Sequence, residues 1–416
     1  MVSIPRNLLI RAIAAIIVIQ FVLFVSLLKT DSLDWTAIVP GPPGPVIEDC
    51  LGLLPEPKIT CIQTVNRYNL KMAKPPKKSK LAQASGLQQP YVPIVIMAHK
   101  RPLYMRNLMK SLRDVDGINE TMLIVSHDGY VKEIDDAVAE LSPIPYINIY
   151  HPESREFLKG TTLDTDFFKH GAARRHYWWM WNSLYKNILP SLFPKLNSTY
   201  AVTLEEDHIV SRDVYYLLLR LLQEAKKTCK DCFSVNLGVI DGPAVDRGSP
   251  DYAIRKSLTH NAGLTFSTEM FNRFITHALE WCEFDEYNWD WGIFRMTQDR
   301  ILPGYTLLPV HTRVEHVGSC GMHHKAEGNC EKLMTNVEEK WRTPMNARLK
   351  SSVWLDGPLE VLNERPDNRN ISGKMEGHHG WRTKNALKGA NYSTYDEIKD
   401  LNNFICLRVA FDPLPL

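Results

Sequence analysis

Short apolar segments alternate with amphipathic ones from Val92 onward. The runs "VPIVIMAH", "TMLIVSHD" and "PYINIYHP" are apolar enough to predict buried strands. Between them, "RPLYMRNLMKSLRDVDG" and "VKEIDDAVAEL" place apolar residues at helical spacing. Strand, helix, strand, helix and strand within about sixty residues predict an α/β protein with a parallel sheet.

Polar residues follow the predicted strands, and a later apolar run, "TYAVTLEEDH", ends in the same way. Because parallel sheets bind ligands outside the carboxyl ends of their strands, we expect these side chains to face one crevice. The sequence has no glycine-rich dinucleotide fingerprint and no P-loop motif, so a nucleotide would be held by side chains. In chain order, the strand ends carry His99, Lys100 and Arg101; Ser126, His127 and Asp128; and Glu205, Glu206 and Asp207.

The three consecutive acids allow two interpretations. Carboxylates that a buried strand delivers into a crevice are hard ligands, which suit Mg²⁺ or Mn²⁺. The alternative is a solvated strand end whose acids cap the next helix, since Ser211 and Asp213 are cap residues. Spacing alone favours neither interpretation.

Acids alternate with aromatic residues in "EFDEYNWDWGIF", residues 283–294. This mixture is typical of a sugar-binding cleft, where aromatic faces pack on pyranose rings and carboxylates accept hydrogen bonds from hydroxyls. Asp290, set between two indoles, is in surroundings that suit a general base. The alternative is an amphipathic core segment with its acids on the wet side.

Two further segments combine basic and aromatic residues. In "RRHYWWMWNSLY", residues 174–185, the basic residues suit a phosphate or a nucleoside, whereas the three tryptophans are more typical of a core. The segment "EHVGSCGMHH" supplies three histidines, one of which would complete a metal shell with the acids. The sequence alone does not choose among His316, His323 and His324.

The N-terminal region differs from the rest of the chain. Residues 8–28 form an apolar run of 21 residues, long enough to cross a bilayer. Arg6 and Arg11 predict a cytoplasmic N-terminus, so we interpret the run as an uncleaved signal anchor; a cleaved signal peptide is the alternative. The predicted organisation is a cytoplasmic tail at 1–7, an anchor at 8–28, a Pro- and Lys-rich linker-like stem at 29–90 and a lumenal domain at 91–416.

Charge and cysteine content agree with a secretory protein. The net charge of +2 over 416 residues argues against a general nucleic-acid binder. Eight cysteines behind an anchor predict disulfides. Cys229 and Cys232 would form a local disulfide, since no second CxxC is present to complete a zinc site. Sequons at Asn119, Asn197, Asn370 and Asn391 fit a lumenal domain.

The motifs "LEEDH", "YNWDW" and "CGMHH", in this order behind a signal anchor, closely resemble the N-acetylglucosaminyltransferase II family. The resemblance implies a GT-A fold, a Rossmann-like mixed sheet flanked by helices. It also implies Mn²⁺ as cofactor and UDP-N-acetylglucosamine (UDP-GlcNAc) as donor. The implied reaction is an inverting transfer of N-acetylglucosamine to O2 of the α1,6-arm mannose of an N-glycan, which forms a β1,2 bond. The implied location is the Golgi membrane, single-pass type II, and the sequence is compatible with a homodimer.

The resemblance also implies roles for individual residues. Asp207 and His316 would be the metal ligands, and Asp290 the base. The implied donor-binding residues are Met97, Ala98, His99, Lys100, Arg101, Asp128, Ala172, Ala173, Arg174, Arg175 and His176. Where relatives carry a donor-binding arginine after the CxxC region, this chain has Ala244, with Arg247 displaced. The implied disulfides are Cys229–Cys232, Cys282–Cys406 and Cys320–Cys330, which leaves Cys50–Cys61.

Two alternatives stay open. One is the related N-acetylglucosaminyltransferase I activity on the α1,3 arm, from which the "NWDW" window distinguishes this chain. The other is a non-catalytic, membrane-anchored lectin, which would bind glycans without a UDP-sugar or a metal. The presence of Asp207, His316 and Asp290 argues against the lectin.

Overall fold

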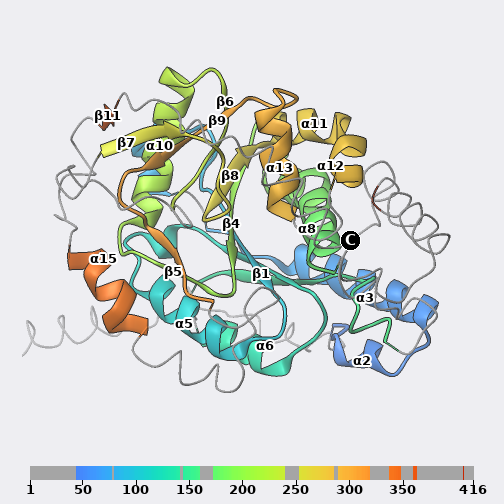
Figure 1. Cartoon of the computed structure of the whole chain (residues 1–416). Helices are drawn as coiled ribbons and strands as arrows, with labels where there is room; N and C mark the ends of the chain where they lie inside the picture. Colours follow the sequence, from blue (N-terminus) through green and yellow to red (C-terminus); the bar gives the residue numbers. More distant parts are fainter. Residues whose placement is uncertain are drawn as a thin grey trace, which may run out of the picture. The chain divides into compact units, whose positions relative to one another are not determined.

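A mixed sheet organises the computed structural model of the chain (Figure 1). The structure describes residues 44–76, 79–140, 144–159, 172–238, 253–284, 289–318, 337–347, 359–362 and 406. Within these residues the sheet has nine strands. In sheet order they are β11 (Glu360–Leu362), β7 (Ala253–Ser257), β9 (Tyr305–Pro309), β6 (Cys232–Val235), β8 (Leu264–Ser267), β4 (Tyr200–Glu205), β1 (Ile94–Ala98), β2 (Leu123–His127) and β3 (Tyr146–Tyr150).

The four neighbouring strands β4, β1, β2 and β3 are parallel, as the apolar runs predict. Their carboxyl ends therefore share one edge, where Met97 of β1 lies opposite both Ser126 of β2 and Glu205 of β4. On the other side of β4, β8 runs antiparallel and makes the sheet mixed. The predicted α/β class, with a large mixed sheet flanked by helices, is confirmed.

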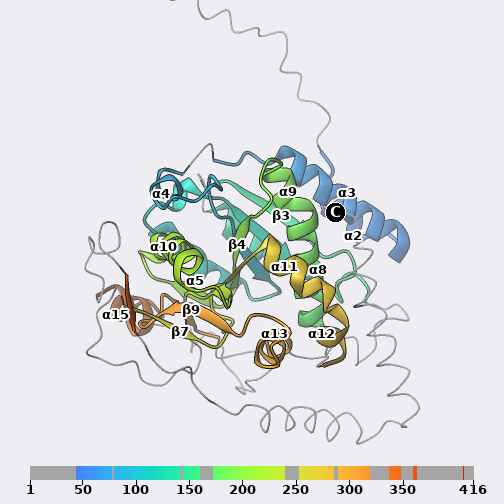
Figure 2. The same ribbon diagram turned by 90° about the horizontal axis from the view of Figure 1, so that it is seen from above.

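Alternation of side chains along the parallel strands gives the sheet two buried faces. One face packs on α5 (Pro102–Arg113), α6 (Lys132–Ala139) and α10 (Val214–Thr228), and the other packs on α8 (Ala172–Ser183), α11 (Thr268–Thr276), α12 (Ala278–Phe284) and α13 (Trp289–Gln298). Figure 2 shows α5 and α10 on one side of the parallel strands and α8 and α11 on the other. The first core takes Ile94, Ile96, Leu123 and Val125, and the second takes Val95, Met97, Ile124 and Ile147.

The tryptophans in the second half of α8 belong to the second core. Trp178, Trp179 and Trp181 are all at most 1% exposed, so the core interpretation of these tryptophans is confirmed. Trp178 stacks on Trp281 of α12 with ring centroids 4.5 Å apart. A pair of large aromatic rings at this distance contributes packing beyond its buried area.

Part of the predicted linker is folded. Residues 48–51 and 55–72 form α2 (Glu48–Leu51) and α3 (Pro55–Met72), which belong to the same unit as the sheet, Pro45–Leu416. The Asn66 side chain donates to the Tyr150 carbonyl and accepts from the Tyr150 amide, both at 2.8 Å. Ile62 and Val65 of α3 also pack with Tyr150 in a small apolar cluster. The helix escaped prediction because only a few of its residues are apolar and buried, which leaves a weak apolar pattern.

Several short helical elements also occur among the described residues. None of the described helices is long and apolar enough to cross a membrane, and the predicted anchor at 8–28 lies outside the described residues. The short elements are α4 (Lys80–Ala84), α9 (Leu189–Leu192), α15 (Thr343–Ala347), a 3₁₀ turn η2 (Ile118–Glu120) and two π-helical turns, η3 (Leu184–Ile188) and η4 (Glu338–Arg342).

Three of the predicted disulfides are present. Cys50 pairs with Cys61, Cys229 with Cys232, and Cys282 with Cys406. The local disulfide predicted at the CxxC segment is thereby confirmed. Cys320 and Cys330 lie outside the described residues, so their pairing stays a prediction.

Candidate active site

The acidic tip of β4 is brought beside His316 by a small second sheet. The chain turns at Glu206 and Asp207 and continues as β5 (His208–Val210), which pairs antiparallel with β10 (Val314–His316). In this register His316 lies directly opposite His208. Of the three candidate histidines, His316 is the one among the described residues, and it lies beside the acidic tip; His323 and His324 lie outside the described residues.

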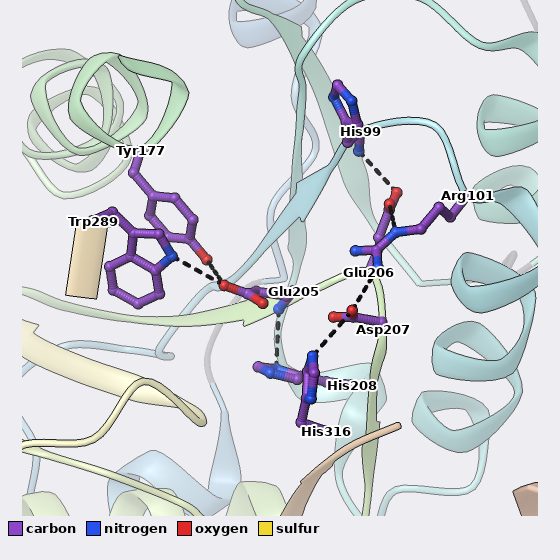
Figure 3. Close-up of polar contacts among 9 residues, drawn as sticks. All are labelled: His99, Arg101, Tyr177, Glu205, Glu206, Asp207, His208, Trp289 and His316. Carbon is purple, nitrogen blue, oxygen red and sulfur yellow. Dashed lines mark hydrogen bonds and ion pairs between the residues drawn. The ribbon is translucent and has the colours of Figure 1, made fainter. Parts of the chain in front are cut away.

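Asp207 contacts both Arg101 and His316 at the tip (Figure 3). Its Oδ2 accepts from Arg101 Nη1 at 2.7 Å and lies 3.2 Å from His316 Nε2. Burial raises the pKa of Asp207, but the hydrogen bond with His316 and the charge of Arg101 outweigh it and bring the pKa below its ordinary value. The side chain therefore carries a negative charge at neutral pH.

Glu205, Asp207 and His316 together have the geometry of a cation site. One ligand atom from each lies within 4.8 Å of the other two. Asp207 Oδ1 is buried and has no hydrogen-bond partner, an arrangement that a bound cation would satisfy. Gly318 leaves room there, since a Cβ on it would lie 2.2 Å from Asp207 Oδ2 and 2.8 Å from His316 Nε2. Within this group, Asp207 and His316 offer the carboxylate and imidazole that suit Mn²⁺, whereas Glu205 Oε1 already accepts hydrogen bonds from Tyr177 and Trp289.

Gly318→Ala is expected to weaken cation binding about 10- to 100-fold, as do changes that disturb the orientation of ligands. The added methyl group overlaps Asp207 Oδ2 and must displace it from His316. Calorimetric titration of Mn²⁺ in the presence of UDP measures the effect. Gly52→Ala is the matched control, because no atom lies within 4 Å of the place that its added methyl group would take. Equal Mn²⁺ affinity in both variants would contradict a site at Asp207.

Glu206 points to the strand end rather than into the cluster. Its carboxylate accepts from the His99 amide at 2.8 Å and from Arg101 Nε at 2.6 Å. The Arg101 guanidinium therefore joins Glu206 to Asp207. Glu206 supports the β1 and β4 ends, which sequence spacing alone did not indicate.

The predicted donor-binding residues 97–101 differ in how far their side chains are buried. The side chains of Met97 and Ala98 are buried in the sheet, whereas His99 is half-buried and Lys100 is exposed. His99 Nδ1 lies 3.2 Å from Asp128 Oδ2. The structure thus brings together His99 and Asp128, two of the predicted donor-binding residues, and Glu206 accepts hydrogen bonds from both the His99 amide and Arg101.

Asp128 is held from a second side by a histidine that the sequence analysis did not single out. His151, which follows β3, places Nδ1 3.4 Å from Asp128 Oδ1. Burial raises the pKa of Asp128, but its hydrogen bonds with His151 and His99 bring it well below the ordinary value. The position of His151 at the end of "YINIYHP" was the available signal.

The predicted donor residues at the start of α8 separate into two environments. Ala172 and Ala173 begin the helix. Arg174 Nη2 donates to the Trp281 carbonyl, and its guanidinium lies 4.2 Å from the centroid of that indole. His176 Nε2 lies 2.9 Å from Ser126 Oγ at the end of β2.

Both basic residues that follow Arg174 have lowered pKa values. Burial lowers the pKa of His176 to about 3, so this ring is neutral at physiological pH. Burial also lowers the pKa of Arg175 to about 10, against the opposing charge of Asp128. The charge of Asp128 acts on both groups, which places this end of α8 beside the Asp128 cluster.

Asp290 lies at the first turn of α13, where the helix dipole favours a negative charge. Its Oδ1 accepts from the Trp291 amide at 2.9 Å, and its Oδ2 accepts from Asn261 Nδ2 at 3.1 Å. Burial, then the charge of Asp207 and, less strongly, that of Asp290 raise the pKa of Glu205 to about 7. Asp290 is therefore close enough to act electrostatically on the acidic tip.

The fold and this site define an α/β protein with an acid–imidazole cluster at the carboxyl edge of its parallel strands. The sequence model of the N-acetylglucosaminyltransferase II (MGAT2) family matches residues 63–161 and 168–381, and the chain belongs to this family of glycosyltransferases. The resemblance inferred from the motifs is thereby confirmed.

Curated relatives agree with the family. The chain is 28% identical over 271 residues to a Homo sapiens protein and 29% identical over 279 residues to an Arabidopsis thaliana protein, both named alpha-1,6-mannosyl-glycoprotein 2-beta-N-acetylglucosaminyltransferase. The matches cover 56% and 60% of this chain. They span 59% and 64% of the two relatives, about three-fifths of their length.

Proposed function

We propose that the protein is an inverting, Mn²⁺-dependent GT-A glycosyltransferase that transfers N-acetylglucosamine from UDP-GlcNAc to O2 of the α1,6-arm mannose of N-glycans. The observation that carries the proposal is the cluster of Glu205, Asp207 and His316, which a 3.2 Å hydrogen bond from Trp289, the chain neighbour of Asp290, joins to the start of α13. The family and the names of the relatives support this donor sugar and this acceptor. The product linkage would be β1,2.

Asp207 and His316 are the residues that would hold Mn²⁺. The buried, unpartnered Oδ1 of Asp207 and the bare Cα of Gly318 fit an ion at this place. When bound, Mn²⁺ supplies positive charge to the departing diphosphate. Arg101 fixes the Asp207 carboxylate through Oδ2, which keeps the acid in the orientation that a ligand needs.

Asp290 is the proposed base. An ionised carboxylate at the start of α13 would take the proton from the mannose hydroxyl as that oxygen attacks the sugar from the face opposite UDP. Asn261 donates to Oδ2 and the Trp291 amide donates to Oδ1, so the carboxylate is oriented before the acceptor binds. This preorganisation supplies part of the rate enhancement.

The donor nucleotide would lie at the β1 and β2 ends. His99 and Asp128 are adjacent there, and the ionised Asp128 accepts hydrogen bonds. The predicted span at 8–28 would anchor the chain in a membrane with the domain on the lumenal side, and the family resemblance implies that this membrane is the Golgi. Glycoproteins that carry N-glycans would then be the partners.

A transfer assay with the full chain tests the proposal. Detergent-purified protein is incubated with UDP-GlcNAc, Mn²⁺ and glycans that have either the α1,6 or the α1,3 mannose free. We expect product only with a free α1,6 mannose, loss of product with EDTA and recovery with added Mn²⁺. Transfer to the α1,3 arm would indicate the N-acetylglucosaminyltransferase I activity instead. Glycan binding without any transfer would indicate a lectin.

A further inference from the structure

Glu205 joins the acidic tip of β4 to the helix that carries Asp290. Tyr177 Oη of α8 donates to Glu205 Oε1 at 2.6 Å, and Trp289 Nε1 of α13 donates to the same oxygen at 3.2 Å (Figure 3). Trp289 is the first residue of α13 and the chain neighbour of Asp290. One carboxylate oxygen therefore fixes one side chain from each of two helices.

The two donors also hold each other. The rings of Tyr177 and Trp289 are stacked with centroids 3.9 Å apart and planes 17° apart. Both side chains are buried, at 4% and 7% exposure. Because a carboxyl oxygen in a partly buried place without hydrogen bonds is costly, Glu205 favours the arrangement in which both donors face it.

The opposite side of Trp289 is fixed as well. Its carbonyl accepts from Trp281 Nε1 at 3.2 Å. A Cβ on Gly292 would lie 2.5 Å from the Trp281 ring, so the first turn of α13 packs directly against that indole. Between Trp281 and Glu205, the start of α13 has little room to shift.

We propose that Glu205 is a positioning residue that, through Tyr177 and Trp289, sets the start of α13 so that Asp290 faces the Asp207 side of the site. The inference rests on the proposed function, in which Asp290 removes a proton. Both hydrogen bonds go to Oε1, and both come from helices rather than from the β4–β5 turn. Glu205 thus joins α13 to the tip of β4. This link matters for the rate, because a displacement of about 1 Å at the reacting groups lowers a rate about 100-fold.

The test removes the donors and leaves Glu205 in place. Tyr177→Phe, Trp289→Phe and the double variant are compared with Tyr185→Phe, which removes a buried tyrosine hydroxyl from the η3 turn that continues α8. Tyr185 Oη donates to the Phe266 carbonyl at 2.9 Å and has no hydrogen bond with Glu205. It therefore controls for the general effect of losing a buried hydroxyl.

We expect kcat to fall about tenfold in each single variant, the effect of one lost hydrogen bond of this kind on a reacting geometry. The double variant should lose less than the product of the two, because both donors serve one function. The dissociation constant of UDP with Mn²⁺, measured by calorimetry, should stay unchanged. Hydrogen exchange in peptides covering residues 289–298 should be faster than in wild type or Tyr185→Phe.

Three results would overturn the inference. The first is a kcat equal to that of Tyr185→Phe. The second is a parallel loss of UDP–Mn²⁺ affinity, which would assign Glu205 to the metal or the donor. The third is unchanged exchange at 289–298. The exchange experiment needs no turnover, so it tests the positioning role even if the wild-type protein fails to transfer N-acetylglucosamine and the proposed function is wrong.

Discussion

Asp290→Asn is expected to reduce kcat about 10²- to 10⁴-fold, the usual contribution of a positioned general base. Asparagine has the shape of aspartate, but its amide cannot accept the proton of the mannose hydroxyl. The side-chain oxygen can still accept from Asn261 or from the Trp291 amide, so the first turn of α13 should remain in place. Initial rates at saturating UDP-GlcNAc and acceptor measure the loss.

Calorimetry separates this loss of chemistry from a loss of binding. Asp290→Asn should bind UDP and Mn²⁺ as wild type does, since neither Asp207 nor His316 has been altered. Asp299→Asn is the matched control, because this exposed acid follows the C-terminal end of the same helix and pairs with Arg295. Near-normal turnover of Asp290→Asn would show that another group is the base.

The features that the sequence predicted are those encoded by local pattern. Buried parallel strands need continuous apolar runs, and "VPIVIMAH" and "TMLIVSHD" are such runs. Residues that directly follow those runs must lie at the carboxyl edge, so the proximity of His99 to Asp128 was already implied. The acidic residues 205–207 were predicted to lie at this edge for the same reason, because they directly follow the apolar run of β4.

The features that escaped prediction depend on contacts between distant segments. Glu206 meets Arg101 from 105 positions away, and Asn261 meets Asp290 across 29 positions that include two helices. Hydrophobic periodicity in the sequence does not reveal such a pair, because each side chain is an ordinary polar residue in its own segment. The packing of α3 on β3 through Asn66 belongs to the same class.

Local pattern also left the aromatic windows ambiguous for a physical reason. Trp289 has a core side, stacked on Tyr177, and a polar edge that donates to Glu205. An indole can fill both roles at once, because its ring is apolar and its N–H is a donor. Core packing and site geometry were therefore not true alternatives in the "NWDW" segment.

Asp207→Ala is expected to abolish Mn²⁺-dependent binding of UDP, with a loss of affinity well beyond about 100-fold. Changes to residues that only support a metal ligand already cost about 10- to 100-fold. Alanine removes the ligand itself and leaves His316 without its 3.2 Å carboxylate partner. Titration of UDP into protein with and without Mn²⁺ measures the effect.

The fold should survive this substitution. Arg101 keeps its 2.6 Å ion pair with Glu206, and the removal of the Asp207 charge relieves the repulsion that helps to raise the pKa of Glu205. A ligand that binds the folded state raises the melting temperature. Mn²⁺ with UDP should therefore raise the melting temperature of wild type and of the exposed-acid control Asp136→Ala, but not that of Asp207→Ala. If Asp207→Ala binds UDP with Mn²⁺ as wild type does, the cation is held elsewhere, and the unpartnered Oδ1 of Asp207 has another explanation.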